Sequence, residues 1–112
     1  MLNQVILVGR LTKDPEIITT ESNKKVSYIT IAVQRAFKNI YGIYETDFIR
    51  CVLWNVIAEN TVQYTKTGDV IGVKGRLQVE SYEDEEGNVK YITEVVAEKI
   101  SFLSSGKHIE EK

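Results

Sequence analysis

The residues best suited to do chemistry in this chain lie at alternate positions of one short segment, 48–54. This segment is rich in aromatic and β-branched residues and has no glycine or proline, which is typical of a β-strand. Successive strand side chains point to opposite faces, so Phe48, Arg50 and Trp54 share one face with Val52. Two large rings around an arginine suit a surface that stacks bases beside a phosphate chain. Aromatic residues on strands also serve as packing partners, so this segment alone leaves both interpretations open.

Two further predicted strands repeat this combination of aromatic and basic side chains. Single-stranded nucleic acid needs such a surface, because bases stack on rings for roughly 1–3 kcal/mol each while cations follow the backbone. Duplex recognition would require a helix with base-reading side chains, and the one predicted helix has no basic face. The residues concerned are Lys74, Arg76, Gln78 and Tyr82 on the face of one strand, and Arg35, Phe37 and Lys38 at the end of the other.

Catalytic and metal chemistry find little support in the sequence. The only histidine, His108, lies in a polar C-terminal stretch, and Gly72 and Gly75 flank a lysine without forming a phosphate-binding loop. The single cysteine, Cys51, allows no disulfide within the chain and is predicted to be a small buried apolar residue. We therefore expect no enzyme activity, no cofactor and no metal site.

Length and charge set the broad class. A chain of 112 residues fits one domain with a real core. Its net charge of −2 looks unfavourable for a nucleic-acid partner, but four acids fall in the predicted hairpin loop 83–86 and two more at 110–111. Without these acids and Lys112, 13 basic residues face 10 acidic ones. No apolar run reaches the length of a membrane span and no signal pattern precedes the first strand, so we expect a cytoplasmic, nucleoid-associated protein with no membrane partner.

The order of the elements predicts the fold class. Asn55 is expected to cap a short helix, and Leu77 and Val79 are expected to join Ile71 and Val73 on a core face. One helix between the third and fourth of five strands is the arrangement of the OB-fold, an all-β, five-stranded Greek-key barrel. We expect this domain to cover 1–103, followed by a short polar tail over 104–112. The strands are predicted over 3–11, 25–37, 44–54, 70–82 and 89–103, with a short one at 16–19.

Several short motifs run in register along most of the chain. They occupy 3–11, 14–16, 29–32, 51–54, 58–59, 66–68, 75–77 and 93–96. Each is weak alone, but together they resemble the bacterial single-stranded DNA-binding proteins, the SSB family. The resemblance implies an OB-fold that binds and protects single-stranded DNA, with little sequence preference, in replication, recombination and repair. It places base-stacking aromatics at Phe37, Phe48, Trp54 and Tyr82, and phosphate contacts at Arg10, Arg35, Arg50, Lys74 and Arg76.

The resemblance also implies a homotetramer, and the first strand supports this independently. That strand is apolar on both faces, and a small barrel has only one interior, so Ile6 and Val8 need another cover. The chain departs from the family at Ile49, where members often carry an interface histidine, and at Glu80, where the strand is often basic. It also stops before the long linker and acidic tip of typical members. It therefore resembles a short form, either one of those linked to DNA uptake in competent bacteria or a plasmid or phage version. We expect no tail-mediated recruitment of replication proteins.

Two other functions compete with this hypothesis. An interaction module that contacts replication proteins and binds DNA weakly is favoured by the acidic loop and by the negative net charge. The full aromatic set opposes it. An enzyme lacks any candidate catalytic group.

Overall fold

Five strands close into a barrel because β1 (Val5–Leu11) pairs with strands on both of its sides. The sheet order is β1-β5-β6-β4-β3, and the β1–β3 pairing completes the circle. Every pairing is antiparallel except the one between β4 and β6. This computed structural model describes residues 1–104. The other elements are β2 (Ile18–Thr19), β3 (Lys25–Lys38), β4 (Tyr44–Trp54), α1 (Asn55–Tyr64), β5 (Val70–Glu83) and β6 (Val89–Ser104).

The architecture confirms the predicted OB-fold. α1 lies between β4 and β5, the third and fourth strands of the barrel, and β2 is a two-residue addition at the outer edge of β3. The parallel seam between β4 and β6 consists of two registered pairs within residues 1–104. The boundary between a domain over 1–103 and a tail over 104–112 stays a prediction, because the structure does not describe 105–112, where His108 and the terminal acids lie.

Period-two alternation fills the barrel interior as predicted. Ile31, Leu53 and Ile71 are fully buried, and Cys51 and Val95 pack in the same cluster. Burial also raises the pKa of the Cys51 thiol to about 12. Because these side chains come from four different strands, burying them ties the strands into one unit and fixes which residues are left on the outside.

The start of α1 differs from the prediction. Asn55 was expected as the N-cap, but Trp54 takes that position in an extended conformation and no side chain caps the helix. Asn55 instead has a φ of 53°, which asparagine tolerates better than most residues. Its side-chain oxygen accepts a hydrogen bond from the Lys25 backbone N–H at 3.3 Å. The turn between strand and helix therefore uses Asn55 to change the chain direction rather than to cap.

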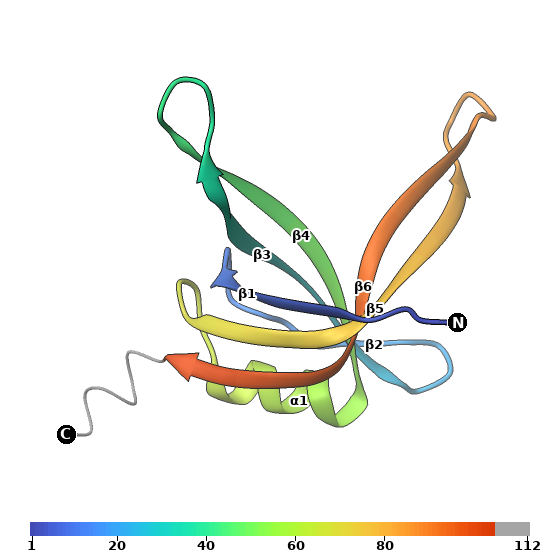
Figure 1. Ribbon diagram of the computed structural model, residues 1–112. Helices are drawn as coiled ribbons and strands as arrows, with labels where there is room; N and C mark the ends of the chain where they lie inside the picture. The colour runs from blue at the N-terminus through green and yellow to red at the C-terminus, as the bar shows by residue number, and fades with distance from the viewer. Residues whose placement is uncertain (105–112) are drawn as a thin grey trace.

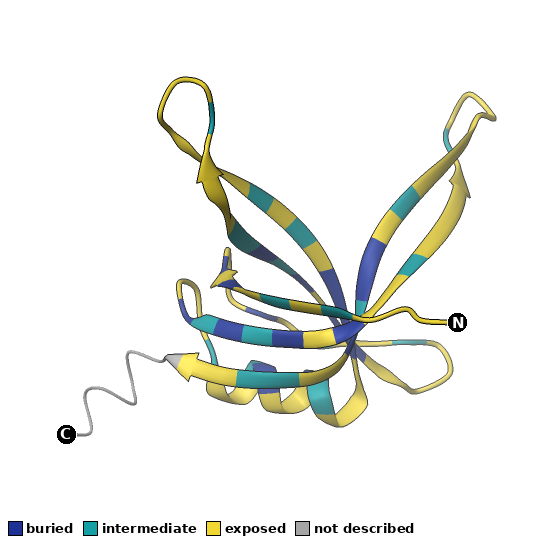
Figure 2. Ribbon diagram, viewed as in Figure 1, coloured by how far each residue is buried: buried dark blue, intermediate teal, exposed yellow. Residues whose placement is uncertain are grey.

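Two hairpins extend from the barrel as arms, one formed by β3 and β4 and the other by β5 and β6 (Figure 1). Their outer halves are mostly exposed (Figure 2). The prediction of Leu77 and Val79 as core residues is therefore wrong for the single chain, since they are 47% and 61% exposed. They continue the inward face of β5, but beyond the barrel no opposing strand covers that face. The arms raise the radius of gyration to 15.8 Å, against about 13 Å for a compact chain of this length.

Candidate nucleic-acid interface

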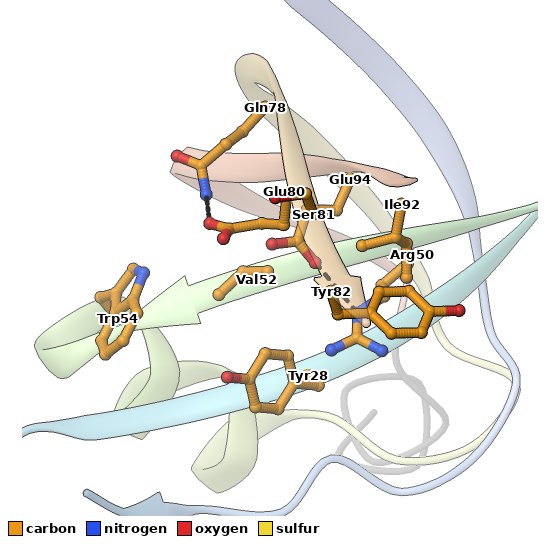
Figure 3. A pocket seen from close by; sticks show the side chains of 10 residues that line it. All are labelled: Tyr28, Arg50, Val52, Trp54, Gln78, Glu80, Ser81, Tyr82, Ile92 and Glu94. Carbon is orange, nitrogen blue, oxygen red and sulfur yellow. Dashed lines mark hydrogen bonds and ion pairs between the residues drawn. The ribbon is translucent and has the colours of Figure 1, made fainter. Parts of the chain in front are cut away.

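A pocket of about 350 Å³ lies where the two arms meet the barrel. Its size is within the usual range for ligand sites, roughly 300–1,000 Å³. β3 and β4 form one wall, while β5 and β6 form the other (Figure 3). The lining residues are Tyr28, Arg50, Val52, Trp54, Gln78, Glu80, Ser81, Tyr82, Ile92 and Glu94.

The outer face of β4 supplies one wall of this pocket, as the alternation predicts. Arg50 and Trp54 are exposed, and Val52 between them is buried as the floor. Tyr28 joins them because β3 pairs with β4 in a register that sets Tyr28 opposite Val52. Phe48 lies on the same face of β4, exposed and one alternation beyond Arg50. Three aromatic side chains, those of Tyr28, Phe48 and Trp54, therefore lie on the same surface as Arg50.

Arg50 is held in place by an acid and a ring. Its Nε donates to Glu94 Oε2 at 3.0 Å, and its guanidinium lies 4.6 Å from the centre of the Tyr28 ring. Glu94 is only 6% exposed, so its carboxylate depends on this ion pair for compensation. Because the bond uses Nε, the two terminal nitrogens of Arg50 have no hydrogen-bond partner within residues 1–104. The arginine is thus oriented by β6 and still able to donate to a ligand.

The opposite wall brings Tyr82 and Glu80 into the same pocket. Gln78 Nε2 donates to Glu80 Oε1 at 2.6 Å, which fixes the carboxylate beside the aromatic surfaces (Figure 3). With Glu94, Glu80 gives the pocket two carboxylates against the one arginine. This lining favours a flat, uncharged group over a phosphate.

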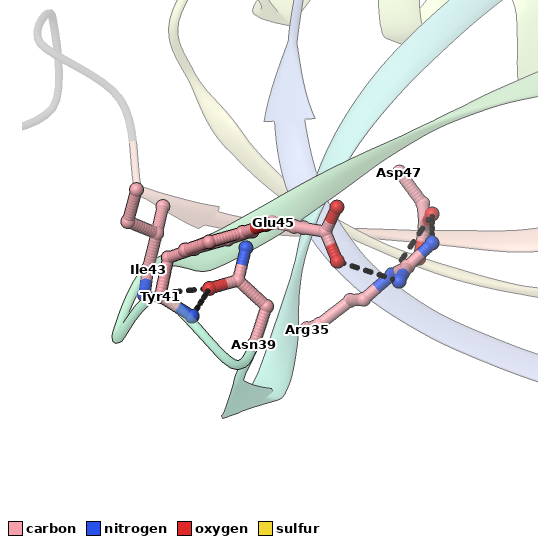
Figure 4. Close-up of polar contacts among 6 residues, drawn as sticks. All are labelled: Arg35, Asn39, Tyr41, Ile43, Glu45 and Asp47. Atoms are coloured by element: carbon pink, nitrogen blue, oxygen red, sulfur yellow. Dashed lines mark hydrogen bonds and ion pairs between the residues drawn. The ribbon is translucent and has the colours of Figure 1, made fainter.

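Arg35, a predicted phosphate contact, is already paired with two acids on β4 (Figure 4). Its Nη1 lies 3.0 Å from Glu45 Oε2 and its Nη2 lies 3.0 Å from Asp47 Oδ1. The hydrogen bonds that Arg35 donates to the Asp47 carboxylate raise the pKa of Arg35 and lower the pKa of Asp47. One cation between two carboxylates leaves a local excess of negative charge. In the structure, Arg35 therefore links β3 to β4 through two ion pairs.

The tip of the β3–β4 arm presents aromatic and basic groups away from the pocket. Phe37 is the most exposed aromatic residue described, and Lys38 Nζ lies 5.6 Å from the centre of the Tyr44 ring. The loop itself is ordered by Asn39, whose side-chain oxygen accepts from the N–H groups of Tyr41 and Ile43 (Figure 4). Phe37 and Lys38 therefore lie at the end of β3, beside a defined loop, and do not line the pocket.

The remaining predicted cations lie along the barrel. Arg10 lines a second hollow of about 350 Å³ between β1 and β3, and its Nη1 donates to the Gly68 carbonyl at 2.8 Å. Lys74 is exposed on β5, opposite Ile6 of β1 and Lys99 of β6. Arg76 follows it on the same face of β5, the face that carries Glu80 and Tyr82 further along the strand. Basic groups therefore lead toward the pocket along β5.

The structure brings together three of the ten predicted site residues, Arg50, Trp54 and Tyr82. Sequence reasoning missed Tyr28 and Glu94 as members of the site. Tyr28 faces outward by the alternation of β3, a signal that could have placed it in the site. Glu94 carried no such signal, because its partner lies 44 residues away on a strand that is not its neighbour in sequence. Within residues 1–104, no group of three or more metal-ligating side chains occurs and no helix is long and apolar enough to cross a membrane.

Comparison with known proteins gives one consistent result. Residues 2–103 match the model of the single-strand binding protein family. The chain is 50% identical to single-stranded DNA-binding protein B of Bacillus subtilis (strain 168) over 103 residues, which are 92% of this chain and 91% of that protein. It is 52% identical to a single-stranded DNA-binding protein of Bacillus cereus over 92% of its length, but spans 61% of that relative. Identity to single-stranded DNA-binding protein 2 of Listeria innocua is 47%, over 98% of this chain and 69% of that protein.

Proposed function

Because the chain belongs to the single-strand binding protein family, we propose that it binds single-stranded DNA with little sequence preference. The family is one of non-enzymatic binding proteins, in agreement with the prediction that the chain is not an enzyme. The observation that carries the proposal is the pocket in which Trp54, Tyr28 and Tyr82 surround Arg50. Rings supply stacking surfaces that every base satisfies, and an oriented guanidinium supplies a contact for the strand beside them.

The strand is proposed to follow the aromatic and basic side chains outside the pocket as well. Phe48 continues the outer surface of β4, and Phe37 with Lys38 offers a further stacking and charged contact on the arm. Lys74 and Arg76 are the phosphate contacts along β5, where exposure leaves both side chains free to move toward a backbone. Arg10 adds a contact beside the second hollow. Arg35 is the weakest member of the predicted set, because its two carboxylate partners oppose a phosphate.

The biological setting is proposed from the family. Binding and protection of exposed strands serve replication, recombination and repair, with uptake of DNA as a further role, in the cytoplasm at the nucleoid. An interaction module with weak DNA binding is the second candidate, favoured by the excess of carboxylates in the pocket and around Arg35. Strong binding at moderate salt would eliminate that candidate.

The oligomer is proposed to be a homotetramer. Ile6 and Val8 on β1 are 70% and 54% exposed in the single chain, so the second apolar face of this strand has no cover. A like subunit provides a matching surface and closes the assembly. Light scattering at micromolar concentration should give about four times the 12.8 kDa chain mass before DNA is added. A monomeric mass with full DNA binding would reject the tetramer and leave the binding proposal intact.

The central test is a fluorescence titration of Trp54 with oligo(dT) at several salt concentrations. Trp54 is the only tryptophan and is 37% exposed at the pocket. A base stacked on its indole should quench the emission, and the affinity should fall as salt rises. Measured by the fluorescence anisotropy of a labelled oligo(dT), because the variant has no tryptophan, Trp54→Ala should weaken binding by about 1–3 kcal/mol. Tyr64→Ala, at a ring that packs against Phe102 and does not line the pocket, is the control and should leave binding unchanged. An emission spectrum that does not respond to saturating oligo(dT) would contradict the proposed role of Trp54.

A further inference from the structure

The pocket contains a feature that stacking alone does not require. The Glu80 carboxylate lines it together with Trp54 and Tyr82, although a negative charge opposes the approach of DNA. Its Oε1 accepts from Gln78 Nε2 at 2.6 Å, and its Oε2 has no hydrogen-bond partner within residues 1–104. An ionised carboxylate is an acceptor only. The pocket wall therefore presents a fixed acceptor next to the surfaces on which a base would stack.

The chemistry of the base edges decides what such an acceptor recognises. Cytosine and adenine carry amino groups that donate, whereas thymine presents a carbonyl acceptor at the corresponding position. Guanine adds an N–H beside its amino group. Thymine and uracil have a single ring N–H that lies between two carbonyl oxygens, and these oxygens face a carboxylate unfavourably. An amino-bearing base can thus satisfy Glu80, while a thymine or uracil cannot do so without repulsion.

The charge balance excludes the alternative that a phosphate fills this position. Arg50, the one cation of the lining, is already bonded to Glu94, and Glu80 adds a second carboxylate. A phosphate beside Glu80 would meet a net negative lining at short range, where like charges cost most. A neutral base with a donor edge meets no such penalty.

We infer that Glu80, positioned by Gln78, reads the edge of the base stacked in this pocket and favours amino-bearing bases over thymine and uracil. The inference rests on the proposed binding of single-stranded DNA and adds a base preference to it. Stacking remains tolerant of sequence, so the preference is confined to one base position in each chain. Homopolymers also differ in how strongly their own bases stack, so the preference is measured as a change between variants and not as an absolute order.

The experiment compares oligo(dC) with oligo(dU) of equal length, because cytosine and uracil share one ring shape and differ in their donor and acceptor groups. The variant is Glu80→Gln, whose amide both donates and accepts and so suits either base. The matched control is Glu83→Gln on the same strand. Glu83 is exposed, lies on the opposite face of β5 by alternation and does not line the pocket. Each substitution removes one negative charge, so both should strengthen binding to all oligonucleotides through long-range electrostatics.

The dissociation constant for oligo(dU) divided by that for oligo(dC) should have the same value in the intact protein and in Glu83→Gln. In Glu80→Gln that ratio should fall by roughly three- to tenfold, the loss expected for one charge-assisted base contact near the surface. Equal ratios in Glu80→Gln and Glu83→Gln would overturn the inference while leaving single-stranded DNA binding established. Failure of the intact protein to bind any of the oligonucleotides, oligo(dT) included, would instead reject the proposed function and the inference with it.

Discussion

Replacing Arg50 by alanine should lower both stability and DNA affinity, and the two losses can be separated. The substitution leaves Glu94, which is 6% exposed, without the cation 3.0 Å away. Breaking a fully buried ion pair costs about 3–5 kcal/mol. The Arg50 side chain is 43% exposed, so water compensates in part, and we expect about 2 kcal/mol for the stranded carboxylate. Loss of the contact with the Tyr28 ring adds about 0.5 kcal/mol.

The measurement is urea unfolding followed by circular dichroism at one fixed protein concentration. A loss of about 2.5 kcal/mol should move the midpoint by roughly 1 M, given the usual urea dependence of a small domain. Adding Glu94→Gln to Arg50→Ala removes the stranded charge, so most of the lost stability should return. DNA affinity should stay low in the double variant, because the guanidinium is still absent. Additive effects of the two substitutions on stability, or an unchanged midpoint in Arg50→Ala, would refute the role assigned to the pair.

Three further predictions address the surface, the backbone and the core. Lys74→Ala should reduce the slope of log affinity against log salt by roughly 0.7, the value of one lost phosphate contact on a single strand, whereas Arg35→Ala should leave the slope unchanged because two carboxylates already neutralise that guanidinium. Gly75→Ala should destabilise the fold by about 2 kcal/mol or more in thermal unfolding, since a Cβ there would clash with the backbone oxygen of Val96 on β6. Gly72→Ala should cost less than about 1 kcal/mol, because the nearest atom to its Cβ would be 3.5 Å away. Equal losses in the two variants would contradict this account. At pH 8, iodoacetamide should leave Cys51 unmodified in the folded protein and alkylate it in urea, because burial raises the thiol pKa to about 12 and removes the reactive thiolate.

The sequence predicted most of the barrel because alternation is a local property. Arg50 and Trp54 were placed together on one face of their strand, and Ile71 and Val73 on a core face, from the period of two alone. The same rule misplaced Leu77, since alternation gives the face of a strand but not the point where the barrel ends and the arm begins. That point depends on which strands lie opposite, and this follows from long-range pairing.

The charged part of the site was less predictable. Whether Arg35 is free for a phosphate depends on the register of β3 against β4, which brings Glu45 and Asp47 within reach. The bulge between Gln34 and Lys38 shifts that register. The composition includes Arg35 among the basic residues, although in the structure its charge is neutralised by Glu45 and Asp47.

The short seam between β4 and β6 links folding to ligand binding. Within residues 1–104, two registered pairs hold this seam, Cys51 with Val95 and Val52 with Val96, and the Arg50–Glu94 ion pair crosses it from one strand to the other. The pocket spans the same seam, so a strand of DNA bound there would contact both β3–β4 and β5–β6 and hold the two hairpins together. A ligand present at 100 times its dissociation constant stabilises the folded state by about 2.7 kcal/mol. Amide hydrogens of Cys51 and Val95 should therefore exchange more slowly in the complex, because opening the barrel at this seam would first require the DNA to leave.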